Sequence, residues 1–228
     1  KTAQSQTLYV SNSSRHIMQG HYKITTYIDL DDIAFWMDAV RNSENHFSVL
    51  ESFWKGQLKS KEWLIKSLHP VLGSVTDPLD IVIHGGWNGV LASMIFNAGF
   101  ATGRVRSIDI DESCESVANM ICKRQEMIGN FRAETHDMCT YKYEFDPAVV
   151  INTSTEHITQ EQYNTWLARV PNDSMIVLQS NNYYALPEHI RCFDTVADFA
   201  QSCGLSTILK EDTLELPMYN RFLIIGYK

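Results

Sequence analysis

Residues 80–89 have the sequence Asp-Ile-Val-Ile-His-Gly-Gly-Trp-Asn-Gly, and the apolar stretch Val-Leu-Ala-Ser-Met-Ile-Phe follows at 90–96. A β-branched run that passes through glycines into an apolar helical segment is typical of a buried strand followed by a helix. Such a turn presents backbone N–H groups and the positive end of the helix dipole to a ligand. The stretch therefore predicts the first strand and helix of an α/β domain, with a nucleotide or carboxylate site at the turn. In the alternative interpretation, the glycines serve only to pack the helix against the sheet.

The chain downstream of this turn alternates between strand-like and helix-like segments. Further strands are predicted at 105–110, 131–135, 148–152, 174–179, 205–210 and 221–227, and helices at 89–98, 112–127, 160–169 and 194–203. The last two strands follow one another without a helix between them. This order predicts an α/β fold, with a doubly wound, mostly parallel sheet that ends in an antiparallel strand.

The segment upstream of residue 76 has a different pattern. Residues 1–20 are polar and predict a loosely held arm, whereas residues 29–72 carry apolar side chains at helical spacing, as in Ile33, Trp36, Met37 and Val40. We expect an arm and helical lid over residues 1–75 and a Rossmann-like domain over 76–228. The aromatic side chains of the lid would be buried either over the ligand-binding edge of the sheet or in a homodimer interface.

The composition narrows the class of partner. The 228 residues are 44% hydrophobic and 20% charged, which is enough for one substantial core, and 19 Lys and Arg against 27 Asp and Glu give a net charge of −8. An acidic surface repels phosphate backbones and anionic lipids, so we expect a small-molecule substrate, with no nucleic acid and no membrane as partner. Five cysteines without a C-x-x-C pair, and eight histidines without an H-x-x-x-H or H-E-x-x-H pattern, predict no metal site and a reduced, cytoplasmic location.

An acidic residue follows the glycine turn at the spacing expected of a nucleotide-binding site. Asp109 ends the predicted strand at 105–110, about twenty residues after the turn, where a carboxylate can accept hydrogen bonds from both ribose hydroxyls of a nucleotide. A solvated strand tip is the plainer interpretation of this residue, and also of Asp137, which follows the strand at 131–135.

With these features in this order, the chain resembles the class I S-adenosylmethionine-dependent methyltransferases over roughly residues 60–228. The resemblance implies S-adenosylmethionine as cofactor. It matches Gly85 and Gly89 to the outer glycines of the family's G-x-G-x-G turn, with Trp87 at the middle position and Asp109 as the ribose-binding acid. It also makes Asp137 the acid that contacts the adenine amino group, and Asn152 a residue that faces the reacting methyl. The expected cofactor-binding residues are His84, Gly85, Gly86, Trp87, Gly89, Asp109, Asp137 and Asn152.

Polar residues crowd the end of the predicted strand at 148–152, at the edge where ligands sit in open α/β sheets. His157 can act as a general base, with Glu156 orienting it or binding a positive substrate group. The expected catalytic residues are Asn152, Ser154, Glu156, His157 and Tyr183. The alternative is a helix N-cap region in which Ser154 or Thr159 caps and Glu156 meets the helix dipole.

A second polar cluster follows the strand at 174–179. Ser180, Asn181, Asn182 and Tyr184 are the expected substrate-binding residues, because amides hold carboxylates or amines and a tyrosine ring attracts a sulfonium cation. A loop with asparagine-stabilised turns is the alternative.

Three functions fit this pattern. The first is methyl transfer from S-adenosylmethionine to a small molecule. The second is attack at the γ-carbon of its methionine part, as aminocarboxypropyl transfer or as cyclisation to azetidine-2-carboxylate with release of methylthioadenosine, which Trp87 in the glycine turn favours. The third is a nucleotide-binding domain without catalytic activity.

Overall fold

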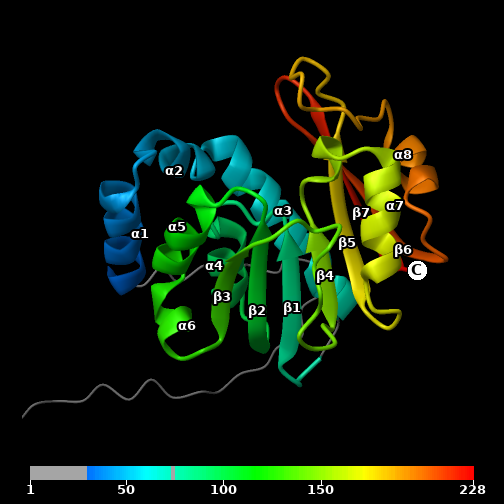
Figure 1. Cartoon of the computed structure of the whole chain (residues 1–228). Coiled ribbons are helices and arrows are strands. Elements are labelled where there is room, and N and C mark those ends of the chain that lie inside the picture. The colour runs from blue at the N-terminus through cyan, green and yellow to red at the C-terminus, as the bar shows by residue number, and fades with distance from the viewer. Residues whose placement is uncertain (1–29, 73–74) are drawn as a thin grey trace, which may run out of the picture.

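The computed structural model describes residues 30–72 and 75–228, which form a seven-stranded sheet between two layers of helices (Figure 1). The strands are β1 (Leu79–His84), β2 (Thr102–Asp109), β3 (Phe131–Thr135), β4 (Val149–Asn152), β5 (Met175–Asn181), β6 (Thr207–Glu215) and β7 (Asn220–Tyr227). The helices are α1 (Leu30–Asn42), α2 (His46–Ser52), α3 (Lys55–Leu72), α4 (Val90–Phe96), α5 (Ser113–Ile121), α6 (Lys123–Met127), the short 3₁₀-helix η1 (Thr155–His157), α7 (Gln160–Arg169) and α8 (Val196–Ser202). The arm predicted for residues 1–20 lies outside the described residues.

The strand order is β3-β2-β1-β4-β5-β7-β6. The strands β1 to β5 are parallel, whereas β7 runs antiparallel to both of its neighbours, β5 and β6. The predicted fold class, a doubly wound sheet with an antiparallel strand near its end, is confirmed. Because chain order reverses direction between β1 and β4, the carboxyl ends of these two strands border the crevice in which ligands bind in open α/β sheets.

Alternate side chains of the strands pack into separate cores on the two faces of the sheet. Val149 and Ile151 of β4 belong to the core beneath α3, α4 and α5, and Val150 between them belongs to the core beneath α7 and α8. Tyr163 and Trp166 of α7 are the largest fully buried side chains of this second core. Burial on both faces explains why the central strands are continuous apolar runs and do not alternate with polar residues.

Some element boundaries differ from those expected from the sequence. The helix α3 contains Pro70 in its last turn, although a proline usually ends or kinks a helix. The helix predicted at 112–127 is broken at Cys122, whose ψ is 27° and whose thiol donates to the carbonyl of Gly89. The strand β6 begins later than predicted and extends to Glu215, because it pairs with β7 along its length. It carries charged residues, as edge strands commonly do.

The N-terminal helices curve over the carboxyl ends of the left half of the sheet in Figure 1. The side-chain amide of Asn88 in the glycine turn donates to the carbonyl of Ser48 in α2, 3.3 Å away, and the hydroxyl of Ser60 in α3 lies 3.4 Å from the Gln179 side chain in β5. Within this lid, Phe53 packs against the core, whereas its neighbour Trp54 is 72% exposed. None of the described helices is long and apolar enough to span a membrane.

Candidate functional site

The turn after β1 has an unusual backbone conformation. Gly85, Trp87 and Gly89 all have positive φ, at 65°, 47° and 75°. A side chain larger than that of glycine costs about 1–2 kcal/mol in this conformation, so Trp87 is strained where the resemblance places a glycine. The glycines also fit tight spaces, since a Cβ on Gly85 would lie 2.1 Å from the Ser154 hydroxyl and one on Gly89 would lie 2.9 Å from the Cβ of Ala118.

Asp109 at the tip of β2 is bonded to this turn. Its Oδ2 accepts from the backbone N–H of Trp87 at 2.8 Å, and its Oδ1 accepts from the N–H of Asp111 at 3.1 Å. The carboxylate is half-buried, and a carboxylate offers about four lone-pair positions. Both oxygens therefore hold the backbone in place and still have lone pairs for the hydroxyl groups of a ligand.

Asp137 lies in the loop after β3 and is exposed. Its Oδ1 accepts from the N–H of Cys139 at 2.8 Å, and its carbonyl accepts from the N–H of Thr140 and of Tyr141. These bonds form a tight turn that keeps the carboxylate at the carboxyl edge of the sheet.

The side chain of His84, the last residue of β1, lies in the core. Its ring is completely buried in edge-on contact with Tyr141, Tyr143 and Trp166, and its Nε2 lies 3.0 Å from the Tyr143 hydroxyl. Burial, with a smaller effect of His136, lowers the pKa of His84 to about 3. The side chain is therefore a neutral core residue, and only its backbone belongs to the turn.

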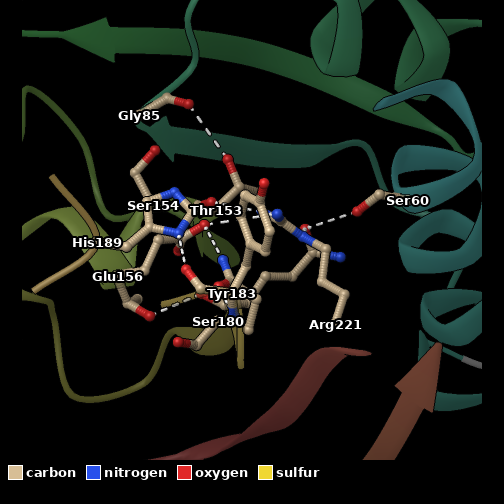
Figure 2. A network of polar contacts seen from close by, with 12 residues as sticks. Ser60, Gly85, Thr153, Ser154, Glu156, Ser180, Tyr183, His189 and Arg221 are labelled. Atoms are coloured by element: carbon tan, nitrogen blue, oxygen red, sulfur yellow. Dashed lines mark hydrogen bonds and ion pairs between the residues drawn. The ribbon is translucent and has the colours of Figure 1, made fainter. Parts of the chain in front are cut away.

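The end of β4 is organised by Asn152, which is buried. Its Oδ1 accepts from the N–H of Ser154 at 3.0 Å, and its amide nitrogen lies 3.3 Å from the sulfur of Met138. The Thr153 hydroxyl donates to the carbonyl of Gly85 at 3.2 Å. The loops after β1 and β4 are thus joined, and Ser154 stands beside the glycine turn (Figure 2).

Glu156 lies at the centre of a buried polar network drawn in Figure 2. Its Oε1 accepts from the side-chain amide of Asn181 at 2.8 Å and lies 3.5 Å from the guanidinium of Arg221. Arg221 also donates to Gln179 and to the carbonyl of Thr153. The network ties together the ends of β4, β5 and β7.

The side chains of His157 and His189 lie next to this network. Their rings are 4.8 Å apart between centroids, and the His189 Nδ1 lies 2.8 Å from the carbonyl oxygen of Tyr183. The ring of Tyr183 contacts those of His189 and Tyr219. His157 is exposed, so this corner of the site is open to solvent.

The expected substrate-binding residues divide into two groups. Asn181 belongs to the Glu156 network. Ser180 donates to the carbonyl of Arg191, Asn182 accepts from the N–H of Asn220, and Tyr184 donates to Asp194. Local structure therefore uses the polar groups of Ser180, Asn182 and Tyr184.

The lid contributes a second basic group. Lys61 of α3 donates to the Gln57 side chain at 2.9 Å. Burial, together with the charge of Arg221, lowers the pKa of its ammonium to about 7. Lys61 therefore lies near Arg221, at the same edge as Glu156, as a group that can release its proton near pH 7.

Arg221 and Gln179 are the main site residues that the sequence analysis did not single out for a role. Arg221 is the one charged residue in the strand sequence Arg-Phe-Leu-Ile-Ile-Gly-Tyr, and Gln179 ends an apolar run. A charged or amide side chain at the end of an otherwise apolar strand is the signal that could have identified both.

A separate open groove of about 580 Å³ runs along β3, outside the loops that follow β1, β4 and β5. It is lined by Arg106, Glu115, Asn119, Glu126, Gly129, Phe131, Arg132, Ala133, Glu134 and Thr135. Glu115 and Asn119 accept from the backbone N–H groups of Thr135 and Ala133. The groove's polar side chains thus protect an edge strand, and we place the candidate site at the carboxyl edge of the central strands.

Comparison with known proteins gives structural matches but no sequence match. No family model matches the chain, and no curated protein matches it. Magnesium protoporphyrin IX methyltransferase (ChlM) from Synechocystis PCC 6803 with bound SAM matches with a TM-score of 0.58 and 16% identity, over 86% of this chain and 90% of that one. N-methyltransferase NodS from Bradyrhizobium japonicum WM9 in complex with S-adenosyl-L-homocysteine matches with a TM-score of 0.62 and 9% identity, over 85% and 98%.

A nicotianamine synthase, MtNAS in complex with MTA and tNA, also matches, with a TM-score of 0.56 and 12% identity over 86% of this chain and 70% of that one. These likenesses extend over most of the chain. The fold is that of the class I S-adenosylmethionine-dependent methyltransferases, as the resemblance implied.

Proposed function

We propose that the chain is an enzyme that binds S-adenosylmethionine at the glycine turn and transfers its methyl group to a small molecule held between the loops after β4 and β5. The observation that carries the proposal is the hydrogen bond from the Trp87 N–H to the Asp109 carboxylate. It brings the acid at the tip of β2 against the turn after β1, at the edge where parallel α/β sheets bind nucleotides. Structural neighbours with the same fold hold SAM or S-adenosyl-L-homocysteine.

The residues present fit this cofactor. Gly85 and Gly89 give the turn a left-handed backbone, which places it directly against Ser154 in the loop after β4 and Ala118 in α5. Asp109 has lone pairs left for the two ribose hydroxyls. The carboxylate of Asp137, in the loop after β3, can accept a hydrogen bond from the adenine amino group. Asn152 and Ser154 would stand nearest the reacting centre at the end of β4.

When bound, S-adenosylmethionine supplies a sulfonium whose methyl carbon and methionine γ-carbon are both electrophilic. The acceptor must lose a proton as it attacks, and two basic groups at this edge can take it. His157 is exposed, beside the Glu156 carboxylate, and Lys61 has a pKa lowered to about 7. Arg221 holds Glu156 in place through their ion pair.

Chemistry at the γ-carbon is the second candidate function. MtNAS, whose crystal structure contains MTA, shares the fold. Trp87 stands in the turn where the resemblance places a glycine next to the methionine part of the cofactor, and its φ of 47° means that the turn carries a bulky residue at a backbone cost. A ligand tail held differently by this turn would expose the γ-carbon to attack.

The experiment that separates the two functions follows the products. Purified protein is incubated with S-adenosylmethionine alone and with a metabolite extract, and both reactions are analysed by mass spectrometry. S-adenosylhomocysteine that forms only with extract supports methyl transfer. Methylthioadenosine formed from the cofactor alone, above a no-enzyme control, supports the γ-carbon reaction instead. If neither product forms and calorimetry detects no S-adenosylmethionine binding at millimolar concentration, both functions are excluded.

The Asp109→Asn variant tests the site itself. An amide presents an NH₂ group to one of the two backbone N–H donors, and it loses the charge that favours hydroxyl donors. Hydrogen bonds to a charged group contribute about 1.5–3 kcal/mol, so we expect the dissociation constant of S-adenosylmethionine to rise about 10- to 100-fold. Glu112→Gln, which removes an exposed carboxylate nearby in the chain, is the matched control. Equal affinity of Asp109→Asn and wild type would contradict the proposed binding mode.

A further inference from the structure

Three side chains from two loops converge at the carboxyl edge of β4 and β5. Glu156 and His157 lie in η1, after β4, and His189 lies in the loop after β5. Each offers one ligand-type atom, and these atoms all lie within 4.8 Å of one another. A carboxylate with two imidazoles is a donor set that suits divalent first-row transition metals, which bind such ligands at about 2.0–2.2 Å.

Glu156 contains a buried oxygen that the described residues leave without a partner. The residue is 2% exposed, and its Oε1 accepts from Asn181 and faces Arg221, whereas its Oε2 has no hydrogen bond. Buried carboxylate oxygens are normally satisfied, because leaving one unpaired costs free energy. An ion bound to Oε2 would remove this cost without breaking the contacts of Oε1.

One ring nitrogen of His189 is hydrogen-bonded to the backbone. Its Nδ1 lies 2.8 Å from the Tyr183 carbonyl oxygen, which can only accept, so Nδ1 carries the hydrogen and Nε2 carries the lone pair. Histidines that ligate metals typically donate their other N–H to a backbone carbonyl or carboxylate in this way, which fixes the ring and its tautomer. This observation is independent of the orphaned oxygen of Glu156, and both favour the same ligand.

We propose that Glu156, His157 and His189 bind one divalent first-row transition-metal ion, with Zn²⁺ as the representative probe. Three protein ligands leave at least one coordination position open, as in catalytic zinc sites. His157 is exposed, so an ion at this site can be reached from solvent. The neighbouring charge of Arg221 favours an anionic oxygen ligand or hydroxide at that position. This site does not depend on S-adenosylmethionine binding.

The metal site also assigns roles within the polar network. His157 bound to an ion cannot accept a proton, which leaves Lys61 as the basic group of this edge. Glu156 would contact the ion through Oε2 and Arg221 through Oε1. Short metal-binding motifs do not reveal this triad, because His189 lies on a different loop from His157, with the whole of α7 and β5 between them in the sequence.

The test uses the full chain, stripped of metal with a chelator and titrated with Zn²⁺ by calorimetry, with bound metal counted by elemental mass spectrometry after dialysis. We expect the His189→Gln and His157→Gln variants each to bind one Zn²⁺ fewer than wild type, or to bind that ion at least about a hundredfold more weakly. His46→Gln, which removes an exposed imidazole at the start of α2, is the matched control and should bind as wild type does. Zn²⁺ should raise the melting temperature of wild type and of His46→Gln more than that of the two variants.

Glu156→Gln also removes the partner of Arg221 and can unfold the chain, so the histidine variants carry the conclusion, with circular dichroism to confirm that they fold. Equal stoichiometry and affinity in wild type, His157→Gln and His189→Gln overturns the proposal. So does loss of the ion in His46→Gln alone. Neither result depends on whether S-adenosylmethionine binds, because no cofactor is present in the titration.

Discussion

His84 makes the stability of the protein depend on pH in a window that is easy to measure. Its imidazole is fully buried among Tyr141, Tyr143 and Trp166, and burial lowers its pKa from 6.5 to about 3. The folded protein therefore keeps this ring neutral at every pH well above that value. In the unfolded chain the ring takes up a proton below pH 6.5.

The sign and size of the effect follow from linkage. Between pH 6.5 and 3 the unfolded state binds a proton that the native state does not, so stability falls as pH falls through this range. Lowering the pH from 7.5 to 5.0 raises the statistical weight of the unfolded state about 30-fold through this one group, which is about 2 kcal/mol at 25 °C. For a chain of this size, that free energy corresponds to about 4–8 °C in melting temperature.

The assay compares the unfolding free energies of wild type and His84→Phe in urea at pH 7.5 and 5.0. A phenyl ring keeps the edge contacts with the three aromatic neighbours, loses the contact with the Tyr143 hydroxyl, and carries no titratable proton. Carboxylates with a lowered pKa, such as Asp80 and Asp111, affect both proteins equally. We expect the drop in stability between the two pH values to be smaller in the variant by about 2 kcal/mol. A difference below about 0.5 kcal/mol would contradict this prediction, because it would mean that the native protein protonates His84 almost as readily as the unfolded chain does.

Three further predictions concern the turn, a helix cap and the lid. Gly85→Ala places a Cβ 2.1 Å from the Ser154 hydroxyl at a φ of 65°, so we expect the free energy of unfolding in urea to fall by at least about 1–2 kcal/mol. Gly99→Ala, at φ 81° with nothing within 4 Å of the added Cβ, should lose only the free energy that comes from the left-handed backbone. Thr159→Ala removes the capping box with Gln162 at the start of α7 and should cost about 1 kcal/mol; a loss no greater than that of Thr165→Ala, in the same helix, would contradict this. Lys61 has a pKa lowered to about 7 in the native state, so between pH 7 and 10.5 the unfolded chain binds a proton that the native state does not. Stability should therefore rise with pH in that window, and the free energy of unfolding should increase more in wild type than in Lys61→Met.

The fold class could be predicted because its signals are local in the sequence. Each central strand is a continuous apolar run, such as Ala-Val-Val-Ile-Asn at 148–152, bounded by polar turns and followed by helical periodicity. The strand bounds at 131–135 agree with β3, and the helix at 160–169 agrees with α7. Periodicity failed where tertiary contacts decide the outcome, as at Cys122, where the thiol contact with Gly89 accompanies the break between α5 and α6.

The site was less predictable because hydrogen-bond partners come from distant parts of the chain. The sequence indicates that polar residues follow β4 and β5, but it does not indicate which of them have free polar groups. Glu156 accepts a hydrogen bond from Asn181 in β5, whereas Tyr184 donates to Asp194 and Ser180 donates to the carbonyl of Arg191. The guanidinium of Arg191, in the loop after β5, likewise packs over the Tyr163 ring and donates to Gln160.

The antiparallel strand explains how Arg221 reaches the site. In a parallel sheet, all strands bring their carboxyl ends to the ligand-binding edge, and the residues that begin them lie at the opposite edge. Because β7 runs in the opposite direction, its first residues lie at the ligand-binding edge, and Arg221 pairs in register with Asn181 at the end of β5. The guanidinium then contacts Glu156 in the loop after β4, a distant part of the sequence. A charged residue at the amino end of β7 thus lies in this fold where one at the carboxyl end of a parallel strand would, at the ligand-binding edge.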